Sequence, residues 1–213
     1  MAALGVLMLD TRFPRIVGDI GNPATFGFPV RYRRVPGASP QRVVHEHDPA
    51  LLQPFIDAGR ALVADGATAI TTSCGFLVLF QRELQAALSV PVWTSSLLLL
   101  AELQGAGVVT VDAAALGVEH LRAAGAPADT PIEGLAPGCA FQRCLLDDEP
   151  TLDVDAARGA TVAAAQRLIA RHPALSTIVL ECTNMPPYAD AVRAATGRTV
   201  HDLTTLLRQR FPH

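Results

Sequence analysis

The sequence predicts an α/β protein of two pseudo-symmetric lobes, each a mainly parallel sheet flanked by helices, with a cleft between them. Short apolar runs rich in β-branched residues alternate with helical patterns along all 213 residues, as expected where strands and helices follow one another. The two halves also match each other. The offset of 108 residues between Cys74 and Cys182 recurs in other aligned pairs, namely Ile70 with Ile178, Val92 with Val200, Leu98 with Leu206, and Leu99 with Leu207.

The start of each half aligns as well. At a slightly smaller offset, the stretch 5–10 matches the stretch 107–112, and each is an apolar run that ends at an aspartate. No low-complexity linker separates the halves, which favours a rigid body with a shared cleft. We expect an N-terminal lobe of residues 1–98 plus 202–213, which carries Cys74, and a C-terminal lobe of residues 99–201, which carries Cys182.

The first half begins with a buried strand over 4–9, followed by a loop dense in glycine and proline. Alternating polarity predicts a second strand over 30–35. A helix is predicted over 49–64. Aspartate is a favoured cap residue, so Asp48 is expected to cap this helix, and the proline that follows is allowed in a first helical turn. The rest of this half is predicted to be a strand over 67–72, a helix over 77–88, a strand over 90–93 and a helix over 97–104.

The second half repeats this alternation. Its predicted elements are a strand over 107–111, a helix over 113–124, a long helix over 153–171, a strand over 176–180, a helix over 186–196, a strand over 199–201 and a final helix to 210 that Asp202 caps. Residues 126–150 are rich in proline, glycine and acidic residues, so the sequence predicts irregular structure there.

Composition excludes several classes of mechanism. The chain contains no lysine, so all seventeen positive side chains are arginine. No side chain is therefore able to form a Schiff base with pyridoxal phosphate or a carbonyl substrate. A Walker A lysine is also missing, and the glycines near residue 20 do not form a dinucleotide fingerprint. We expect a protein that works without a cofactor.

Charge and hydropathy point away from nucleic acid and membranes. The net charge of −3 leaves no basic footprint for nucleic acid. No apolar run approaches the roughly 18 residues of a membrane span, and the N-terminus lacks the pattern of a signal peptide. We expect a cytoplasmic protein.

Metal binding is not expected. Cys139 and Cys144 do not form a Cys-x-x-Cys pair, and we interpret both as structural. His45 and His47 form a His-x-His pattern, which does not define a metal site by itself and more plausibly precedes a helix.

Cys74 and Cys182 are the candidate catalytic residues. Each follows a β-branched run and precedes a helical segment, so each lies at the carboxyl end of a strand, facing a helix N-terminus. Open α/β sheets bind ligands there, and helix N-termini lower thiol pKa values. A racemase takes a proton from one face of a carbon and returns one to the other, which two opposed bases do without moving. Donors for the carbanion are predicted from the backbone after each cysteine and from Thr72, Ser73, Thr183 and Asn184.

The segments Thr-Thr-Ser-Cys-Gly-Phe at 71–76 and Glu-Cys-Thr-Asn-Met-Pro-Pro at 181–187 resemble the cofactor-independent aspartate/glutamate racemase superfamily. That superfamily also contains hydantoin racemases, maleate isomerases and arylmalonate decarboxylases. The resemblance covers essentially the whole chain. It implies two Rossmann-like lobes with the active site between them, and a homodimer or a higher homo-oligomer.

The resemblance also implies roles for individual residues. Cys74 and Cys182 match the two bases, and Thr183 matches the threonine that binds the substrate carboxylate. Asn184 stands where glutamate racemases usually carry a histidine. The step from Asp10 to Thr11 matches an Asp-Ser step whose aspartate supports a catalytic thiol.

Two departures bear on the substrate. Gly75 and Phe76 follow the first cysteine where glutamate racemases have Asn-Thr, which predicts a more apolar pocket. Arg12 lies in a segment that replaces their glycine-rich loop and is a candidate for holding a carboxylate, whereas Arg15 is expected on the surface.

These observations predict an isomerase, specifically a racemase or epimerase of an aspartate-like or glutamate-like amino acid or a close derivative, acting on a small carboxylate. Two related activities fit the same residues, hydantoin racemisation and maleate-type cis-trans isomerisation. A ligand-binding protein without catalysis is the alternative from another class.

Overall fold

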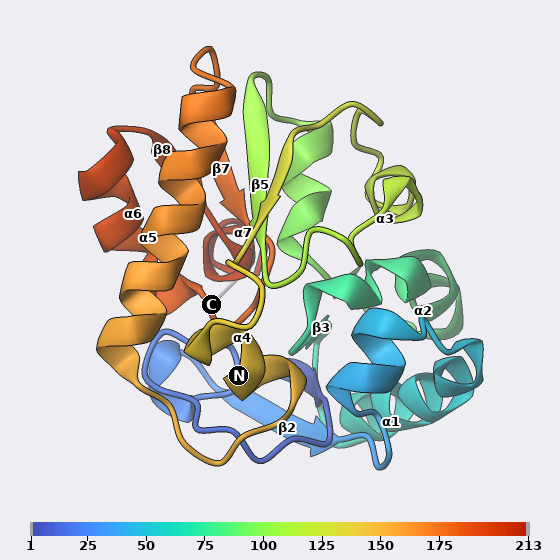
Figure 1. Cartoon of the computed structure of the whole chain (residues 1–213). Helices are drawn as coiled ribbons and strands as arrows, with labels where there is room; N and C mark the ends of the chain where they lie inside the picture. Colours follow the sequence, from blue (N-terminus) through green and yellow to red (C-terminus); the bar gives the residue numbers. More distant parts are fainter. Residues whose placement is uncertain (1, 212–213) are drawn as a thin grey trace.

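Two parallel sheets organise residues 2–211, the part of the chain that the computed structural model describes. The first has the strand order β2-β1-β3-β4 and the second the order β6-β5-β7-β8. The strands of the first sheet are β1 (Leu4–Met8), β2 (Val30–Arg34), β3 (Ala69–Thr72) and β4 (Val92–Trp93). Those of the second are β5 (Ala106–Thr110), β6 (Ile132–Gly134), β7 (Thr177–Leu180) and β8 (Thr199–His201). Figure 1 shows the two sheets as separate lobes.

The two sheets share their pairing register as well as their order. The aligned rows are Gly5–Ile70–Val92 in the first sheet and Gly107–Ile178–Val200 in the second. Every residue of β3 and β7 is buried, threonines included, because helices cover both faces of a parallel sheet. The predicted α/β fold with two pseudo-symmetric lobes is confirmed.

Helices fill the connections of both lobes. The first lobe carries η1 (Pro23–Thr25), a π-helical turn η2 (Gln41–His45), η3 (Pro49–Leu51), α1 (Leu52–Ala64), η4 (Gly75–Phe80), α2 (Gln81–Ala87) and η5 (Ser96–Ala101). The second carries α3 (Val118–Ala123), α4 (Ala140–Leu146), α5 (Val154–Arg171), η6 (Pro186–Tyr188) and α6 (Ala189–Thr196), and α7 (Leu203–Arg210) follows β8. The side chains of Asp48 and Asp202 accept backbone N–H bonds at the starts of η3 and α7, as predicted.

Three predicted helices differ from the structure. The helix expected over 77–88 begins two residues earlier as the 3₁₀ turn η4, and the one over 97–104 is the 3₁₀ segment η5. The helix over 113–124 shortens to α3. Both 3₁₀ segments follow a strand end closely, and such turns are common where a helix begins in a tight connection.

The prediction of irregular structure over 126–150 is wrong. This stretch contains β6 and α4. Phe141, Cys144 and Leu145 form an apolar stripe with helical spacing, and all three are buried. Burial of this stripe stabilises the helix α4 despite the helix-breaking proline and glycine residues around it.

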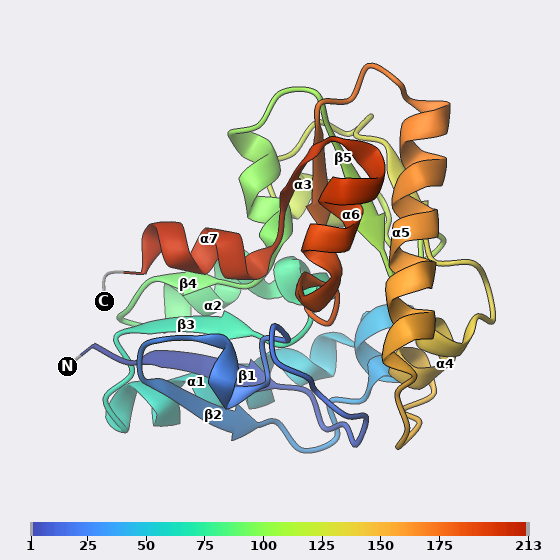
Figure 2. The same ribbon diagram turned by 90° about the vertical axis from the view of Figure 1, so that its left-hand side faces the viewer.

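The C-terminal helix returns to the first sheet. Leu203, Leu206 and Leu207 of α7 pack in one apolar cluster with Leu4 and Ala69, and Figure 2 shows α7 lying along this sheet. The lobe boundaries at 98 and 202 stay a prediction. Of the predicted lobe ranges, residues 1, 212 and 213 lie outside the described residues.

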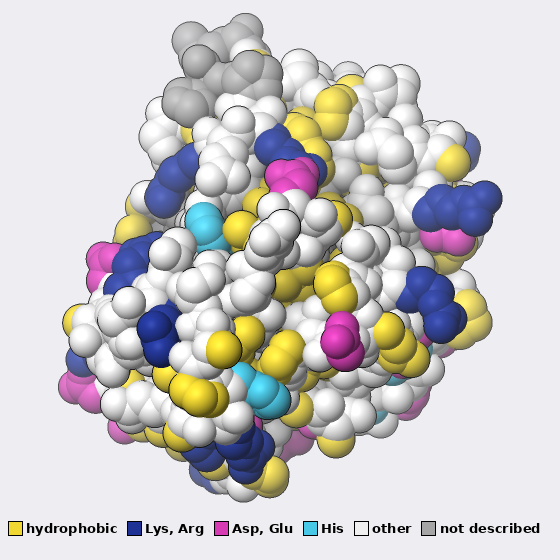
Figure 3. All heavy atoms as spheres, turned by 90° about the horizontal axis from the view of Figure 1, so that it is seen from above, with side chains coloured by type: hydrophobic (Ala, Val, Ile, Leu, Met, Phe, Trp, Pro, Cys, Tyr) yellow, Lys and Arg dark blue, Asp and Glu magenta, His cyan; other side chains and the backbone are white. Residues whose placement is uncertain are grey.

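The described surface carries no dominant charged face in the view of Figure 3, where basic and acidic side chains lie singly or in opposite pairs. None of the helices between residues 2 and 211 combines the length and apolar character needed to traverse a bilayer. Within the same residues, no three histidine, cysteine or carboxylate side chains gather as a metal site. Homo-oligomerisation stays a prediction.

Candidate active site

Cys74 and Cys182 line the same cavity, which has a volume of about 30 Å³ and lies where the carboxyl ends of β3 and β7 meet. Its polar wall includes Ser73, Thr183 and Asn184. Its apolar lining includes Phe13, Val44, Phe76, Val111, Leu145 and Leu146. The fold therefore brings the two cysteines together, with one sulfur from each lobe.

Local structure explains where the thiols lie. Cys74 has an extended backbone and precedes the first turn of η4, so the N–H groups of Phe76 and Leu77 point toward its sulfur. Cys182 precedes η6, and the N–H group of Asn184 points toward its sulfur. Each thiol thus sits at a strand-to-helix turn whose free amides favour negative charge.

Burial nevertheless keeps both thiols protonated. It raises the pKa of Cys74 to about 12, and the nearby Glu181 charge adds to this rise. The amides of Phe76 and Leu77 and the charge of Arg15 oppose it. Burial and Glu181 also raise the pKa of Cys182 well above its ordinary value, with only the Asn184 amide opposing them. More of the surrounding groups favour the thiolate of Cys74 than that of Cys182.

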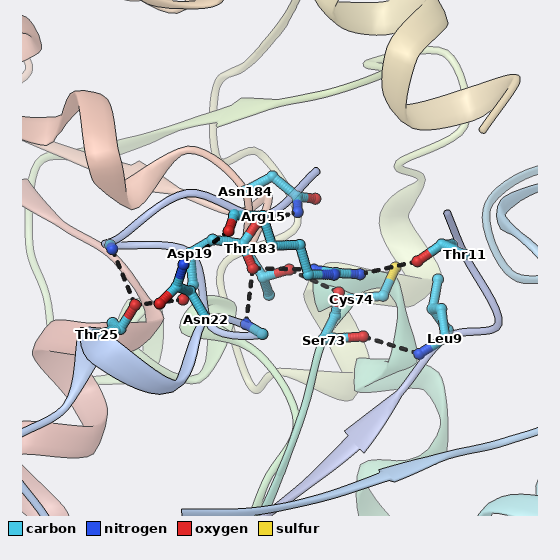
Figure 4. A network of polar contacts seen from close by, with 12 residues as sticks. Leu9, Thr11, Arg15, Asp19, Asn22, Thr25, Ser73, Cys74, Thr183 and Asn184 are labelled. Carbon is cyan, nitrogen blue, oxygen red and sulfur yellow. Dashed lines mark hydrogen bonds and ion pairs between the residues drawn. The ribbon is translucent and has the colours of Figure 1, made fainter. Parts of the chain in front are cut away.

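Hydrogen bonds join the lobes directly behind the cavity. The Thr183 hydroxyl donates to the backbone oxygen of Ser73 over 2.7 Å, and the Ser73 hydroxyl accepts from the Leu9 N–H over 2.9 Å. The Asn184 amide donates to Asp19, and the Cys182 thiol lies 3.5 Å from the Asn184 oxygen. Figure 4 shows this network around Cys74. It fixes the thiols by contacts that cross from one lobe to the other.

Arg15 and Asp19 belong to this network, and the sequence analysis missed both. Arg15 was expected on the surface, yet its side chain is only 10% exposed and Asp19 is 3% exposed. Arg15 Nη1 lies 3.0 Å from Asp19 Oδ1, and Nη2 donates to the Thr11 hydroxyl over 3.2 Å. The glycine-rich loop allows this approach, because a side chain at Gly21 would lie 2.4 Å from Arg15.

Several predicted site residues lie outside the cavity. Asp10 bonds Arg34 and the Gly37 N–H, and Arg12 is 74% exposed while it pairs with Asp148. The side chain of Leu9 faces the cavity instead, since neighbouring residues at a strand end point in opposite directions. Thr11 holds Arg15, and Thr72 is buried behind Cys74, where it donates to the Thr94 carbonyl.

Glu181 was also missed as a site residue. It lines the cavity, is 1% exposed, and its Oε2 accepts a hydrogen bond of 2.7 Å from the Thr110 hydroxyl. Among the described residues its Oε1 has no hydrogen-bond partner. Burial raises its pKa to about 7. A glutamate between a buried strand and a candidate cysteine was the signal in the sequence, because such a side chain points inward.

Comparison of folds places this architecture among known enzymes. Unliganded arylmalonate decarboxylase has a TM-score of 0.59 at 16% identity, over 94% of this chain and 87% of that one. An aspartate racemase homologue from Pyrococcus horikoshii has a TM-score of 0.56 at 12% identity, over 98% and 97%. Glutamate racemase from Bacillus anthracis has a TM-score of 0.53 at 16% identity, over 99% and 83%. The resemblance to the aspartate/glutamate racemase superfamily is confirmed for the fold.

Comparison of sequences identifies nearer relatives, although no family model matches the chain. The dimethylsulfoniopropionate lyase of Durusdinium sp. clade D is 36% identical over 94% of this chain and 71% of that protein. Dimethylsulfoniopropionate lyases 6 and 7 of Emiliania huxleyi are 33% and 32% identical, each over 95% of this chain. The chain spans 57% and 64% of their lengths.

These relatives correct the functional prediction. An enzyme is confirmed, but the racemase or epimerase activity is wrong, because relatives that match nearly the whole chain are lyases. The catalytic role of the two cysteines stays a prediction, and their motifs do not determine which reaction follows. With 36% identity over 94% of its length to the Durusdinium enzyme, the chain belongs to the dimethylsulfoniopropionate lyase family.

Proposed function

We propose that this enzyme cleaves dimethylsulfoniopropionate by β-elimination, releasing dimethyl sulfide and acrylate. The observation that carries the proposal is the match of nearly the whole chain to lyases that are named for this substrate. The cavity supports it, since its lining combines two thiols with polar and apolar side chains. A zwitterion with a carboxylate at one end and two methyl groups at the other suits a lining of both kinds.

The reaction requires one base. A thiolate removes a proton from the carbon beside the carboxylate, and the electron pair forms the new carbon–carbon double bond. The bond from the next carbon to sulfur breaks, and its electron pair leaves with the neutral sulfide. No acid is needed for the leaving group, and the proton stays on the thiol until solvent removes it.

Cys74 is assigned as this base. Glu181 disfavours both thiolates, but two backbone amides and Arg15 favour that of Cys74, whereas Cys182 has one favourable amide and the charge of Asp19 against it. Cys182 then stays a thiol that donates to the Asn184 oxygen. In this assignment the two cysteines have different tasks, unlike the exchangeable bases of a racemase.

Substrate binding itself helps to ionise Cys74. In the empty cavity burial raises the pKa of this thiol to about 12. A unit positive charge about 5 Å away, at an effective dielectric constant of about 20, favours a thiolate by roughly 3 kcal/mol, or about a hundredfold in its ionisation constant. The sulfonium of the substrate supplies such a charge. The negative charge of Glu181, which raises the pKa of the same thiol, offsets part of this effect.

The polar wall is assigned to the carboxylate. The Ser73 hydroxyl accepts from the Leu9 N–H and keeps its own proton to donate, and Asn184 also lines the cavity. The Thr183 hydroxyl donates to the Ser73 backbone oxygen and so helps to hold this wall in place. Donors at the carboxylate stabilise the negative charge that develops on the neighbouring carbon.

Release of dimethyl sulfide from dimethylsulfoniopropionate, measured by headspace gas chromatography, tests the proposal. We expect Cys74→Ser to lower kcat by about 10³-fold or more, because it removes the base, and Cys182→Ser to lower it by about 10- to 100-fold. Cys139→Ser is the matched control, because Cys139 caps α4 away from the cavity and serine is a good cap. A wild-type protein that releases no dimethyl sulfide contradicts the function, and a larger loss in Cys182→Ser contradicts the assignment of the base.

A further inference from the structure

Glu181 is a buried carboxyl group without a counter-charge. No ion pair among residues 2–211 includes it, and the buried guanidinium nearby, Arg15, is engaged with Asp19 and Thr11. Thr110 satisfies only Oε2, while Oε1 is buried without a hydrogen-bond partner in the described chain. Buried polar atoms of this kind are rare and call for a functional reason.

The unpartnered oxygen is held at the cavity wall. Glu181 lines the cavity together with Cys74 and Cys182. Its Oε1 lies so close to Gly75 that a Cβ atom there would be 2.2 Å away. The carboxyl group therefore packs directly against Gly75, which lines the same cavity.

The cavity offers this carboxyl group no hydrogen-bond donor on its apolar side. Phe13 and Phe76 supply aromatic rings there, and Val44 and Leu145 supply aliphatic surface. An ammonium ion would need acceptors for its N–H groups at such a wall. An onium group with methyl substituents has no donors, and it is recognised by a nearby anion, by aromatic faces and by apolar contact.

We propose that the Glu181 carboxylate is the counter-charge for the cationic end of the substrate, so that the site selects carboxylates that carry a methylated onium group. This inference rests on the proposed function and names the residue that recognises the sulfonium. Burial raises the pKa of Glu181 to about 7 in the empty cavity. A bound cation favours the ionised form, so cation binding and ionisation of this residue support each other.

Two ligands of equal shape separate charge from size. 3-(Trimethylammonio)propionate is an onium carboxylate with a poor leaving group. In 4,4-dimethylpentanoate, a neutral tert-butyl group replaces the trimethylammonium group and the carboxylate is kept; it is called the neutral isostere below. By isothermal titration at pH 8 we expect the wild type to bind the onium ligand at least about tenfold more tightly. In Glu181→Gln the two affinities should agree within about twofold. Glu133→Gln, which alters another buried glutamate that pairs with Arg167 and Arg171, should keep the wild-type preference.

The pH dependence of ligand binding to the wild type gives a second measurement, which does not depend on whether a variant folds. Onium affinity of the wild type should rise from pH 6 to pH 8 as Glu181 ionises, whereas affinity for the neutral isostere should not rise. Equal pH profiles for the two ligands, or an unchanged onium preference in a folded Glu181→Gln, overturn the inference.

Dimethyl sulfide release on the same preparations separates this inference from the proposed function. Lyase activity without an onium preference overturns the role of Glu181 alone. An onium preference that depends on Glu181, in a protein that releases no dimethyl sulfide, supports the role of Glu181 and contradicts the lyase.

Discussion

Gly75 shows how a single residue allows the lobes to meet at the site. A Cβ atom at this position would lie 2.2 Å from Glu181 Oε1 and 2.6 Å from the Glu181 backbone oxygen. Contacts below 3.0 Å essentially never occur, so the backbone of the first lobe approaches this closely only because the residue has no side chain. Glycine is needed at position 75 because a side chain has no space at this buried contact between two strand ends.

Gly75→Ala should therefore destabilise the protein. We expect a loss of about 1–3 kcal/mol in the free energy of unfolding, the usual cost of overpacking, as measured by urea denaturation. Dimethyl sulfide release should fall as well, because Glu181 and the Cys74 turn must shift.

Gly159→Ala in α5 is the control, because a Cβ there meets nothing within 4 Å. It should stabilise the protein by about 0.5–1 kcal/mol, as alanine does in a helix interior. Equal effects of the two substitutions would show that the contact with Glu181 does not limit residue 75.

At the scale of single residues, the sequence predicts the positions of the two thiols better than those of the charged side chains. Cys74 and Cys182 follow recognisable strands, so their meeting could be predicted from strand order alone. Arg15 and Asp19 lie in a long loop without periodicity, and only the folded loop turns them inward. Asp10 is predicted from the family resemblance and Arg12 from a segment that departs from it, and the turn after Leu9 directs both side chains elsewhere.

Two loops from different lobes are joined by Asp148. Its Oδ1 accepts from the backbone N–H groups of Arg12 and Phe13 over 2.6 and 3.1 Å, and its Oδ2 lies 3.1 Å from Arg12 Nε. The contact links the loop after β1 to the connection between α4 and α5. Phe13 and Leu146, which flank it, line the cavity. Entry of a substrate into this narrow cavity requires these walls to move.

The Asp148 contact should weaken in acid. Despite burial, which acts in the opposite direction, the bonds from Arg12 and Phe13 hold the pKa of this carboxyl below its ordinary value near 4. A lowered pKa in the folded state means that the contribution to stability is complete above the ordinary pKa and is lost as pH falls through the folded value. We expect Asp148→Asn to be less stable than wild type at pH 6, with the difference narrowing toward pH 3.

Urea denaturation at both pH values measures this change. Asp155→Asn is the control, because Asp155 forms only an exposed ion pair with Arg158. A difference between wild type and Asp148→Asn that stays constant from pH 6 to pH 3 would contradict the assignment.

At the scale of elements, strands were easier to predict than short helices. The buried strands β1, β3, β5 and β7 are short runs dominated by apolar and β-branched residues, which local patterns reveal. The helix α4 spans only seven residues and its stripe is brief, so proline and glycine nearby obscured it. The 3₁₀ character of η4 and η5 depends on the tight strand connection, which no local pattern encodes.

The whole molecule is a pair of similar sheets whose strand ends meet at one shared site. Strand order and register agree between the lobes, and each lobe contributes one sulfur. The repeat could be read from the offset of 108 residues, but the reaction could not. Proton removal beside a carboxylate is common to racemases and to β-eliminating lyases, so the same site geometry serves both.

A pair of histidines, one of them fully buried, also spans the lobes. His120 of α3 is fully buried, and its ring lies 4.8 Å from that of His47 and 5.1 Å from that of Phe76, centroid to centroid. Burial, with the neighbouring His47, lowers the pKa of His120 to about 4. The contact between the lobes therefore depends on a histidine that stays neutral.

This contact predicts how the stability of the molecule depends on pH. An unfolded histidine titrates near pH 6.5, so between pH 6.5 and 4 the unfolded chain binds a proton that the folded chain does not. The contribution of His120 to stability is complete above pH 6.5 and should fall by on the order of 2 kcal/mol as pH drops toward 4.

His120→Asn should be less stable than wild type at pH 8 but should lose less stability on acidification, as measured by urea denaturation across this range. His172→Asn, at the exposed end of α5, should keep the wild-type dependence. If His120→Asn loses as much stability as wild type between pH 6.5 and 4, the buried histidine is not what couples folding to acid.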